Sequence, residues 1–459
     1  MSERNVNIED TLIALVDGKK YNTLRDVLIT MNPADIASVF DDMPEQKLPL
    51  LFRLLPKELA AETFVEMESD LQEMLIKGFS DNELKDVIEE LYIDDAVDIV
   101  EEMPANVVNR ILENTDPSTR KMINEILKYP EDSAGSIMTI EYVRLRADMT
   151  VSEALRVIRK TGIDKETIYT CYVVNSSRKL IGMVSAKTLL LSGEDDVIGD
   201  IMETNLIYVH TLEDKEVVAN NFKKYDFLAM PVVDDEQRLV GIVTVDDAID
   251  VMEDEATEDI EKMAAIIPTD KPYLQTSAIA TWKARIPWLL LLMISATFTG
   301  IILTKFENAL AAHITLSAFI PMLMDTGGNS GSQAAVSVIR SISLGELEFK
   351  DVFRVIWKEL RVAVLCGITL ATVNFAKVYL VDYMLIGNMA VFDPITIGVV
   401  CITVAVTVVI AKVIGCTLPI FADKLGFDPA VMASPFITTI VDALSLLVYF
   451  SIATRMLHF

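Results

Sequence analysis

The charged residues of this chain are distributed unevenly, and that distribution limits what the chain can fold into. Residues 1–283 contain 29 Lys and Arg against 57 Asp and Glu, a net charge of −28. Residues 284–459 contain 11 of each, a net charge of zero, and they also hold the long apolar runs. We therefore predict a strongly acidic soluble region followed by a membrane domain.

The overall composition supports this division. A hydrophobic content of 51% with a mean hydropathy of +0.37 is too apolar for an ordinary soluble protein, whereas 24% charged residues are too many for a chain buried in lipid throughout. The acidic surface would attract cations and repel nucleic acid, so no nucleic-acid partner is expected. Met1–Asp10 lacks the basic and apolar segments of a cleavable signal, which predicts that the acidic region stays in the cytoplasm.

Cysteine and histidine usage disfavours several kinds of site. The four cysteines show no CxxC pairing and three lie in apolar runs, which favours packing over a disulfide framework; they are Cys171, Cys366, Cys401 and Cys416. Three histidines make a histidine-based zinc site or catalytic triad unexpected. Because we find no nucleophile–base constellation and no P-loop, the sequence does not predict an enzyme.

Residues 1–130 are predicted to be all-helical. Leu and Ile recur at three- and four-residue spacing, and prolines divide the segment into short helices. Asp35–Pro44 resembles Asp95–Pro104, and such a repeat is typical of a small superhelical domain. An ordinary helical bundle explains the same pattern about as well.

Residues 131–256 mix strands and helices, and a second repeat occurs there at an offset of 59 residues. Tyr172–Ser185 (YVVNSSRKLIGMVS) aligns with Pro231–Thr244 (PVVDDEQRLVGIVT). Each copy has the pattern of a strand, a polar turn, a second strand and a helix, with another helix upstream. This order resembles a tandem pair of CBS motifs. A charged connecting helix is predicted next, ending near Pro268.

Five apolar stretches follow, near residues 286–304, 313–339, 357–381, 391–421 and 429–456. Each is long enough to cross about 30 Å of hydrocarbon at about 1.5 Å per residue. The connection 340–361 carries five Lys and Arg residues, so the positive-inside rule places it in the cytoplasm, in agreement with Lys283 and Arg285 before the first span. Five spans then leave the N-terminus inside and the C-terminus outside.

Asp442 is the only charged residue between positions 430 and 453. An acid near the middle of a membrane costs roughly 2.5–3.5 kcal/mol, so it needs a wet cavity or a counter-charge. A protonated Asp bonded to a neighbouring helix would meet that need. The preceding Pro435, Thr438 and Thr439 favour a cation site instead, because proline frees backbone carbonyls and hydroxyls can bind waters of hydration.

The second apolar stretch contains a polar, glycine-rich segment, Pro321–Gln333 (PMLMDTGGNSGSQ). Glycines in membrane helices usually mark close packing between helices. The polar side chains, however, need partners or water in hydrocarbon. Two alternatives remain open, a broken helix and a closely packed helix that lines a pore.

A run of acids at residues 246–261 is the third candidate. Such a run is usually a solvated helix face, but pairs such as Asp250 and Asp254 would repel each other on a helix, as would Asp94 and Asp98 in the first domain. Hard divalent cations bind carboxylate oxygens, and Mg²⁺ usually keeps several waters when it does so. Bridging of two acidic surfaces by Mg²⁺ would make a compact state depend on the ion concentration.

Together these residues resemble the MgtE family of magnesium channels and transporters over essentially the whole chain. The most specific matches are Tyr129–Met138 (YPEDSAGSIM), Ala256–Ile260 (ATEDI), Thr326–Gln333 (TGGNSGSQ) and Asp428–Ala430 (DPA). The resemblance implies a multidomain fold in four parts: an all-α superhelical N domain (1–130), an α/β tandem CBS pair (131–256), a connecting plug helix (257–283) and a five-helix α transmembrane domain (284–459).

The resemblance also implies how such a protein works. A homodimer in the bacterial plasma (inner) membrane would let Mg²⁺ flow down its gradient through a pore lined by the second and fifth spans, with Asp442 as the pore aspartate. Mg²⁺ bound to acids of the N domain, the CBS pair and the plug helix would close the pore. The positions that match these regulatory acids are Asp94, Asp98, Asp226, Asp247, Asp250, Glu255, Glu258 and Asp259.

One departure concerns ATP, which some members of the family bind. Nucleotide-binding CBS modules usually end the second strand with a hydroxyl, two residues and an Asp that holds ribose. The second copy has Thr244 and Asp247, but the first has Ser185 and Thr188. Thr170 offers no aromatic face for adenine. We therefore do not expect tight ATP binding.

Two other functions fit the sequence less well. An anion transporter would need basic groups or helix N-termini in its pore, whereas the last span carries one acid and no Lys or Arg before Arg455. A membrane-anchored sensor that transports nothing would not need Asp442. Among cations, Mn²⁺, Co²⁺ and Ca²⁺ also bind carboxylates and water, and the strict octahedral geometry of Mg²⁺ only biases the choice.

Overall fold

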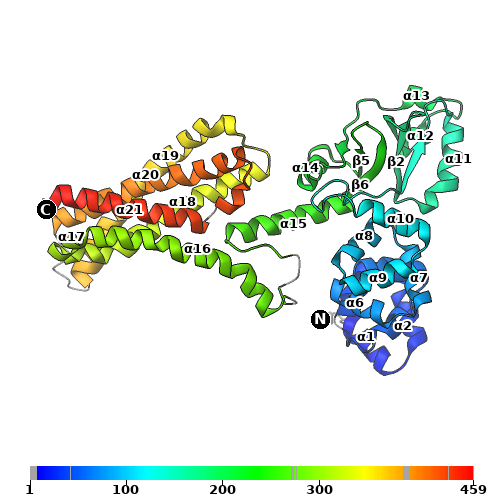
Figure 1. Ribbon diagram of the computed structural model, residues 1–459, viewed down its shortest axis with the longest axis horizontal. Coiled ribbons are helices and arrows are strands. Elements are labelled where there is room, and N and C mark those ends of the chain that lie inside the picture. The colour runs from blue at the N-terminus through cyan, green and yellow to red at the C-terminus, as the bar shows by residue number, and fades with distance from the viewer. Residues whose placement is uncertain are drawn as a thin grey trace, which may run out of the picture. The chain divides into compact units, whose positions relative to one another are not determined.

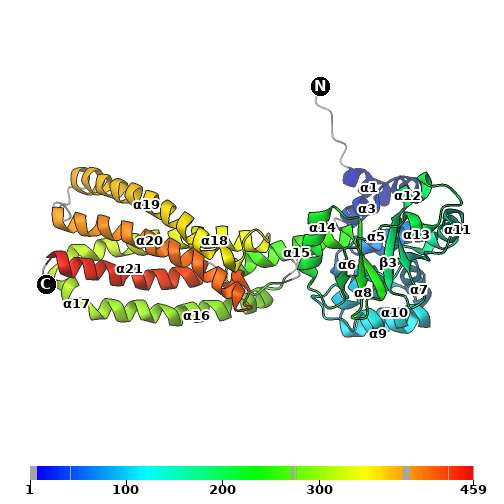
Figure 2. The same cartoon turned by 90° about the horizontal axis from the view of Figure 1, so that it is seen from above.

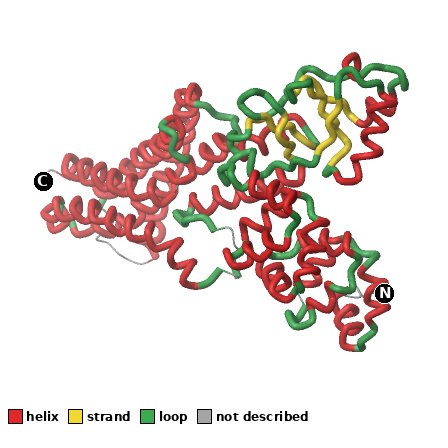
Figure 3. Tube along the Cα trace, turned by 45° about the vertical axis from the view of Figure 1, so that its right-hand side comes forward, coloured by secondary structure: helices red, strands yellow, loops and turns green. Residues whose placement is uncertain are grey.

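The structure is a computed structural model that describes residues 8–41, 43–269, 273–274, 276–385, 393–432 and 434–457. It contains two compact units, Met1–Met252 and Glu253–Phe459. The ribbon in Figure 1 is coloured along the chain, and the tube in Figure 3 shows that strands occur in one part only, among loops and helices.

Short helices form the first part of unit 1. In the described residues they are α1 (Ile8–Asp17), α2 (Tyr21–Leu28), α3 (Pro33–Asp41), α4 (Leu48–Phe52), α5 (Lys57–Val65), α6 (Ser69–Gly78), α7 (Asp81–Glu90), α8 (Ile93–Glu102), α9 (Ala105–Asn114) and α10 (Pro117–Ile126). Local signals set their ends: Ser80 and Glu83 form a capping box at the start of α7, and Pro104 precedes α9 in an extended conformation.

These helices stack in a superhelix around one core. Helix α3 contacts α5, α5 contacts α7, and α7 contacts α9, so each helix packs on the next but one. Their inward residues, among them Leu12, Phe40, Phe64 and Ile111, are buried in one continuous cluster. The predicted all-α superhelical domain is confirmed, and the alternative of an ordinary bundle does not describe this packing.

The second part of unit 1 is built from two copies of one α/β motif. The first has β1 (Tyr142–Leu145), α11 (Val151–Thr161), β2 (Thr167–Val174), β3 (Leu180–Ser185) and α12 (Ala186–Leu191). After α13 (Ile198–Ile201), the second has β4 (Val209–His210), α14 (Lys215–Tyr225), β5 (Ala229–Val233), β6 (Leu239–Thr244) and the start of α15 (Val245–Met263). In each three-stranded sheet the first pair of strands is parallel and the second antiparallel.

The predicted repeat extends to the geometry of the turns. Asn175 and Asp234, 59 residues apart, each accept backbone N–H bonds through the side-chain oxygen at the start of the turn. Arg178 and Gln237, again 59 apart, both have φ of 64°. Hydrogen bonds from Leu180 N–H to the Gln237 carbonyl and from Leu239 N–H to the Arg178 carbonyl join the two copies.

Unit 2 is a bundle of long helices. They are α16 (Ala278–Lys305), α18 (Ile320–Ser343), α19 (Val352–Lys377), α20 (Pro394–Lys424) and α21 (Ser434–Leu457), with a short α17 (Glu307–Ala312) before α18. Figure 2 shows α16, α19, α20 and α21 running side by side. Helix α18 packs against both α20 and α21. Its residue Leu323, together with Phe319 in the turn before it, joins the apolar core of these helices.

Four helices of the described residues are long and apolar enough to span a membrane. They cover Ala278–Lys305, Phe349–Val381, Pro394–Lys424 and Pro429–Leu457. Helix α18 is not among these four, and it differs from them in containing the polar, glycine-rich segment. The predicted span 313–339 begins earlier than α18, because residues Ile314–Phe319 form a 3₁₀ helix, and part of the predicted span 391–421 lies outside the described residues.

The connecting segment differs from its predicted form. Helix α15 is continuous with the second motif of unit 1 and ends at Met263, before Pro268. Ala265 then adopts a φ of 55°, which a helix does not allow. The next helix begins at Ala278, where the Ser277 hydroxyl caps the first turn.

Candidate metal centres

The glycine-rich segment of α18 lies inside a continuous helix. A Cβ on Gly327 would lie 2.8 Å from Ser445 Oγ, and one on Gly331 would lie 2.8 Å from Ile437 Cγ2, both on α21. A Cβ on Gly415 of α20 would lie even closer to the Gly331 backbone. Of the two alternatives left by the sequence, the broken helix is wrong. The glycines allow α18 to pack tightly against α20 and α21.

The opposite face of α18 is polar and uncovered within the single chain. Asp325, Asn329 and Gln333 repeat at four-residue spacing and are exposed, whereas the glycines between them are buried. Asp442 on α21 is half-buried, and Asp325 is the charged group that acts on it electrostatically. The two aspartates therefore lie close to each other on neighbouring helices.

The surroundings of Asp442 differ in part from the prediction. Pro435 lies in the first turn of α21, where backbone N–H groups form no hydrogen bonds within the helix. Its missing N–H therefore breaks no helical hydrogen bond, and Pro435 begins the helix rather than breaking it. The hydroxyls of Thr438 and Thr439 donate to the Pro435 carbonyl at 2.9 and 3.0 Å. Their oxygens can still accept bonds from water, but the proline carbonyl is already occupied.

The end of α15 is fastened to the helical bundle of unit 2. Lys262 Nζ donates to Glu258 at 2.6 Å and to Asp428 at 2.7 Å, and the Ser343 hydroxyl donates to Asp259 at 3.0 Å. Met263 packs on the buried cluster that contains Ala335, Ile339, Ala411 and Val441. Helix α15 thus ends against the end of α18 and the segment before α21.

Burial and neighbouring charges shift the pKa values of the groups at this contact. Burial alone would lower the pKa of Lys262, but its hydrogen bonds to Asp428 and Glu258 outweigh burial and raise that pKa. Burial, followed by repulsion from Asp428, raises the pKa of Asp259. Lys262 therefore remains a fixed positive charge among three carboxylates.

A second group of acids lies in unit 1, where α8 meets the CBS-like motifs. We call it the acid cluster, and its members from three parts of the chain are Asp94, Asp95, Asp98, Glu166 and Asp247. Asp94 is 5% exposed. The Ile93 N–H donates to Glu141 Oε2 at 3.1 Å, which joins the start of α8 to the segment before β1.

Within the part of the chain that the structure describes, two buried oxygens of the acid cluster have no hydrogen-bond partner. They are Oδ1 of Asp94 and Oε2 of Glu166. Asp247, by contrast, accepts bonds from the backbone N–H and hydroxyl of Thr244. Since a buried polar atom without a partner costs free energy, the orphaned oxygens mark a place for a proton or a cation.

Burial and repulsion between neighbouring carboxylates raise the pKa values of the acid cluster. Desolvation, and then the charge of Asp247, raise the pKa of Asp95 to about 7 and that of Asp98 to about 8, although the Asp98 side chain still reaches solvent. Desolvation and Asp95 raise the pKa of Glu166 to about 8. Burial also raises the pKa values of Asp94 and Asp247.

The other predicted ligands lie outside the acid cluster. Asp226 is exposed and caps the C-terminus of α14 in a left-handed conformation, with a φ of 54°. Asp250 is exposed on α15, and Glu255 is half-buried further along the same helix. Among the described residues, no three His, Cys, Asp or Glu side chains converge closely enough to hold a metal ion.

The sequence missed several members of these groups. Glu166 stands outside any acidic run, and only the fold brings it to Asp95, so no local signal marks it. The repeated Asp-Asp of residues 94–95 could have suggested Asp95. Lys262 directly follows the acid run, and its i,i+4 pairing with Glu258 was readable from spacing, whereas its pairing with Asp428 depends on the fold.

The ribose-binding position of the first CBS-like copy is filled by a hydroxyl pair. The Ser185 and Thr188 hydroxyls are 2.9 Å apart, and the Thr188 N–H donates to Ser185 Oγ. Asp247 occupies the equivalent place in the second copy. The exposed aromatic residue of β2 is Tyr169, which points to the opposite face of the strand from Thr170.

The sequence matches three known families along its length. Residues 320–452 match the divalent cation transporter family MgtE, residues 31–132 match the MgtE intracellular N domain, and residues 134–193 and 198–254 match the CBS domain. The magnesium transporter MgtE of Thermus thermophilus is 37% identical over 95% of both chains. That of Bacillus subtilis is 34% identical over 97% of this chain and 96% of its own length.

Solved structures resemble the first unit. The cytosolic domain of the Mg²⁺ channel MgtE, crystallised with ATP, is 37% identical and superposes with a TM-score of 0.51, covering 53% of this chain and 99% of that one. The soluble part of a magnesium transporter is 31% identical, with the same TM-score, and covers 54% of this chain and 98% of its own.

Proposed function

Because the chain belongs to the MgtE family of magnesium transporters, we propose that it is a Mg²⁺ channel that admits the ion to the cytoplasm down its electrochemical gradient. Mg²⁺ bound to its acidic cytosolic domains closes it. The observation that carries the transport part is the polar face of α18 beside Asp442.

That face supports a pore between two copies of the chain. Polar side chains in hydrocarbon need partners or water, and the single chain leaves Asp325, Asn329 and Gln333 uncovered. A second copy related by a two-fold axis would cover this face and bring two Asp442 carboxylates to one passage. Such a pair attracts a hydrated divalent cation. Helix α18, second in chain order, then crosses the membrane together with the four apolar helices and brings the number of spans to five.

The same topology sets the orientation. The connection between α18 and α19 carries Lys350, and Arg354 lies in the first turn of α19; both favour the cytoplasmic side of a bacterial plasma membrane. With five spans, the helical N domain and the CBS pair lie in the cytoplasm and the C-terminus lies outside.

The acid cluster supports the regulatory part. Mg²⁺ would bind the orphaned oxygens of Asp94 and Glu166 and neutralise the repulsion with Asp247. Asp98, on the next turn of α8, lies at the solvent edge of the same site. We assign Asp226, Asp250 and Glu255 to further, more exposed sites that would bridge acidic surfaces through water.

Helix α15 connects this sensor to the pore. It is one helix from Val245 to Met263, so a rearrangement of its first turns is transmitted along its length. Glu258 and Asp259 lie at the end that contacts α18 and the segment before α21. Filled acidic sites would hold this end in the closed position. We expect ATP to bind weakly at most, because Thr188 replaces the acid that would hold ribose and Thr170 offers no aromatic face for adenine.

Mg²⁺ uptake into liposomes that contain the full-length protein tests the pore. Asp442→Asn preserves the shape of the side chain and removes its charge, and it should reduce Mg²⁺ flux to background while leaving the dimer intact in gel filtration. Glu307→Gln removes an exposed acid of the same domain and should leave flux unchanged. Persistent flux in Asp442→Asn would exclude Asp442 from the pore.

A further inference from the structure

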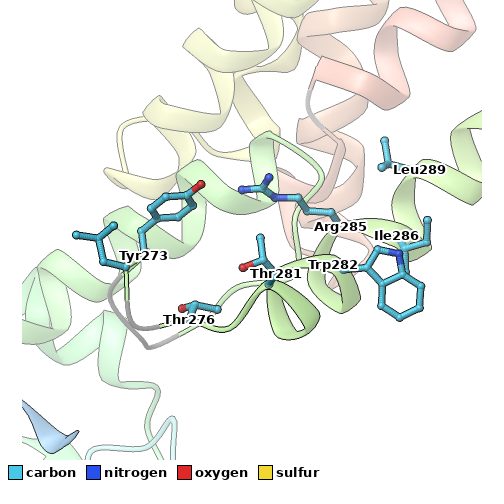
Figure 4. A pocket seen from close by; sticks show the side chains of 9 residues that line it. Tyr273, Thr276, Thr281, Trp282, Arg285, Ile286 and Leu289 are labelled. Atoms are coloured by element: carbon cyan, nitrogen blue, oxygen red, sulfur yellow. The ribbon is translucent and has the colours of Figure 1, made fainter.

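A recess lies at the beginning of α16. Its volume is about 550 Å³, and it opens to one side between the segment before α16 and the first turns of that helix. The residues that give it its character are Tyr273, Thr281, Trp282, Arg285, Ile286 and Leu289. Figure 4 shows them from close by.

The recess has a polar end and an apolar side. In Figure 4 the Arg285 guanidinium extends toward the Tyr273 hydroxyl. Trp282, Ile286 and Leu289 follow the four- and seven-residue spacing of one helix face and line the apolar side. Trp282 and Leu289 are each 58% exposed, and Tyr273 is 75% exposed. So much exposed apolar surface beside an arginine fits the boundary between headgroups and hydrocarbon.

Arg285 has no carboxylate partner within ion-pair distance in the part of the chain that the structure describes. Some other cations of unit 2 are paired, such as Lys262 with Asp428, Lys350 with Glu348, and Arg354 with Asp351. A guanidinium binds phosphate oxygens through two parallel hydrogen bonds, and it does so more readily than a lysine ammonium does. Its charge is thus available for an anion that comes from outside the protein.

We propose that this recess binds an anionic phospholipid of the cytoplasmic leaflet. Arg285 holds the phosphodiester, the Tyr273 and Thr281 hydroxyls donate to its remaining oxygens, and Trp282, Ile286 and Leu289 contact the upper part of an acyl chain. The proposal rests on the proposed function only for the side of the membrane at which α16 begins. Charge complementarity favours this occupant, because the cytoplasmic leaflet is negative and attracts basic groups next to a span.

The site adjoins the connection to α15. The Ile267 N–H donates to the Ala284 carbonyl at 3.0 Å, immediately before Arg285 in the chain. A lipid bound at the recess therefore contacts the helix turn to which the segment after α15 is hydrogen-bonded.

Quenching of Trp282 fluorescence by brominated lipids tests the proposal. The chain has three tryptophans, so Trp288→Phe with Trp357→Phe leaves Trp282 as the single reporter in the full-length protein. This protein is placed in vesicles of phosphatidylcholine that contain increasing amounts of brominated phosphatidylglycerol or of brominated phosphatidylcholine. We expect phosphatidylglycerol to quench at about fivefold lower lipid fraction, the size of effect of one basic residue at a membrane surface.

Two further variants in that background identify the residue responsible. Arg285→Gln should abolish the preference for phosphatidylglycerol. Lys283→Gln removes a neighbouring, exposed cation that does not line the recess, and it should keep the preference. Gel filtration and the tryptophan emission maximum check that each variant is folded.

Three results would overturn the proposal. They are equal quenching by the two lipids, a preference that survives Arg285→Gln, and an equal loss in Lys283→Gln, which would indicate general attraction to the surface. Free glycerol phosphate distinguishes the source of the phosphate: we expect it not to relieve quenching, whereas relief would mean that the recess binds soluble phosphate esters. None of these measurements depends on Mg²⁺ flux.

Discussion

The two acidic contacts of this protein differ in how their negative charge is neutralised. In unit 1 the acid cluster contains only carboxylates, and the charged groups that act on its members are themselves acids. The side-chain hydrogen bond to Asp247 comes from a neutral group, the Thr244 hydroxyl. At the end of α15, Lys262 lies between Glu258 and Asp428. The first contact needs a cation or protons from solution, whereas the second carries its own cation. Sensitivity to Mg²⁺ is therefore expected in the first and not in the second.

The largest effect should come from removing charge in the acid cluster. Asp94→Asn with Asp247→Asn should stabilise unit 1 in Mg²⁺-free buffer at pH 8 by about 2 kcal/mol, because each unit of raised pKa corresponds to about 1.4 kcal/mol and the two groups interact. The same change should abolish stabilisation by Mg²⁺. Chemical denaturation with and without the ion measures both effects.

Glu113→Gln is the matched control for that experiment, since it removes an exposed acid of α9 outside the cluster. It should change neither the stability nor the response to Mg²⁺. A double variant that is still stabilised by millimolar Mg²⁺ would show that the ion binds elsewhere.

Removing the internal cation should have the opposite sign. Lys262→Met keeps much of the side-chain volume but leaves Glu258 and Asp428 unpaired, and with the Lys262 side chain only 24% exposed we expect the contact of α15 with the bundle to weaken by about 1–3 kcal/mol. Hydrogen exchange of residues 255–263 should rise. Lys350→Met, which breaks an exposed pair with Glu348, should have little effect.

The two contacts should also respond differently to pH. The pKa values of Asp95, Asp98 and Glu166 are raised to about 7, 8 and 8, so the folded state binds protons that the unfolded chain has lost. Without Mg²⁺, unit 1 should be least stable above about pH 8 and should gain stability as the pH falls toward the ordinary carboxyl range. The raised pKa of Lys262 means that its contribution is complete below its usual 10.5 and is lost only at higher pH.

Hydrogen exchange in α8 between pH 6 and pH 8.5, corrected for intrinsic rates, measures the first response. Saturating Mg²⁺ should flatten it, because metal and protons compete for the same oxygens. Protection in α8 that rises with pH in the absence of Mg²⁺ would contradict the assignment.

The smallest effect concerns nucleotide. Thr188→Asp gives the first CBS copy the hydroxyl–Asp pattern that Thr244 and Asp247 form in the second. One added charge-assisted hydrogen bond to ribose should tighten ATP binding by about tenfold in titration calorimetry. Unchanged affinity would mean that the ribose position does not limit binding.

The sequence predicted what depends on period and composition. Hydropathy located the apolar helices, and the repeat at an offset of 59 extended even to the turn residues Arg178 and Gln237. It did not predict the continuity of α18, because glycines that break an isolated helix are stabilised here by contacts with α20 and α21. Nor did it place Glu166 beside Asp95, since a contact between distant segments depends on how the domains pack.

Limited proteolysis of the full-length protein, with and without millimolar Mg²⁺, tests the central claim that the acidic unit responds to this ion. Sodium chloride of matched ionic strength serves as the control, because general screening acts on all surface charges. We predict that Mg²⁺ protects the region of residues 130–280 and that sodium chloride does not. Equal cleavage in both buffers, or equal protection by both salts, would contradict Mg²⁺ sensing by the acid cluster.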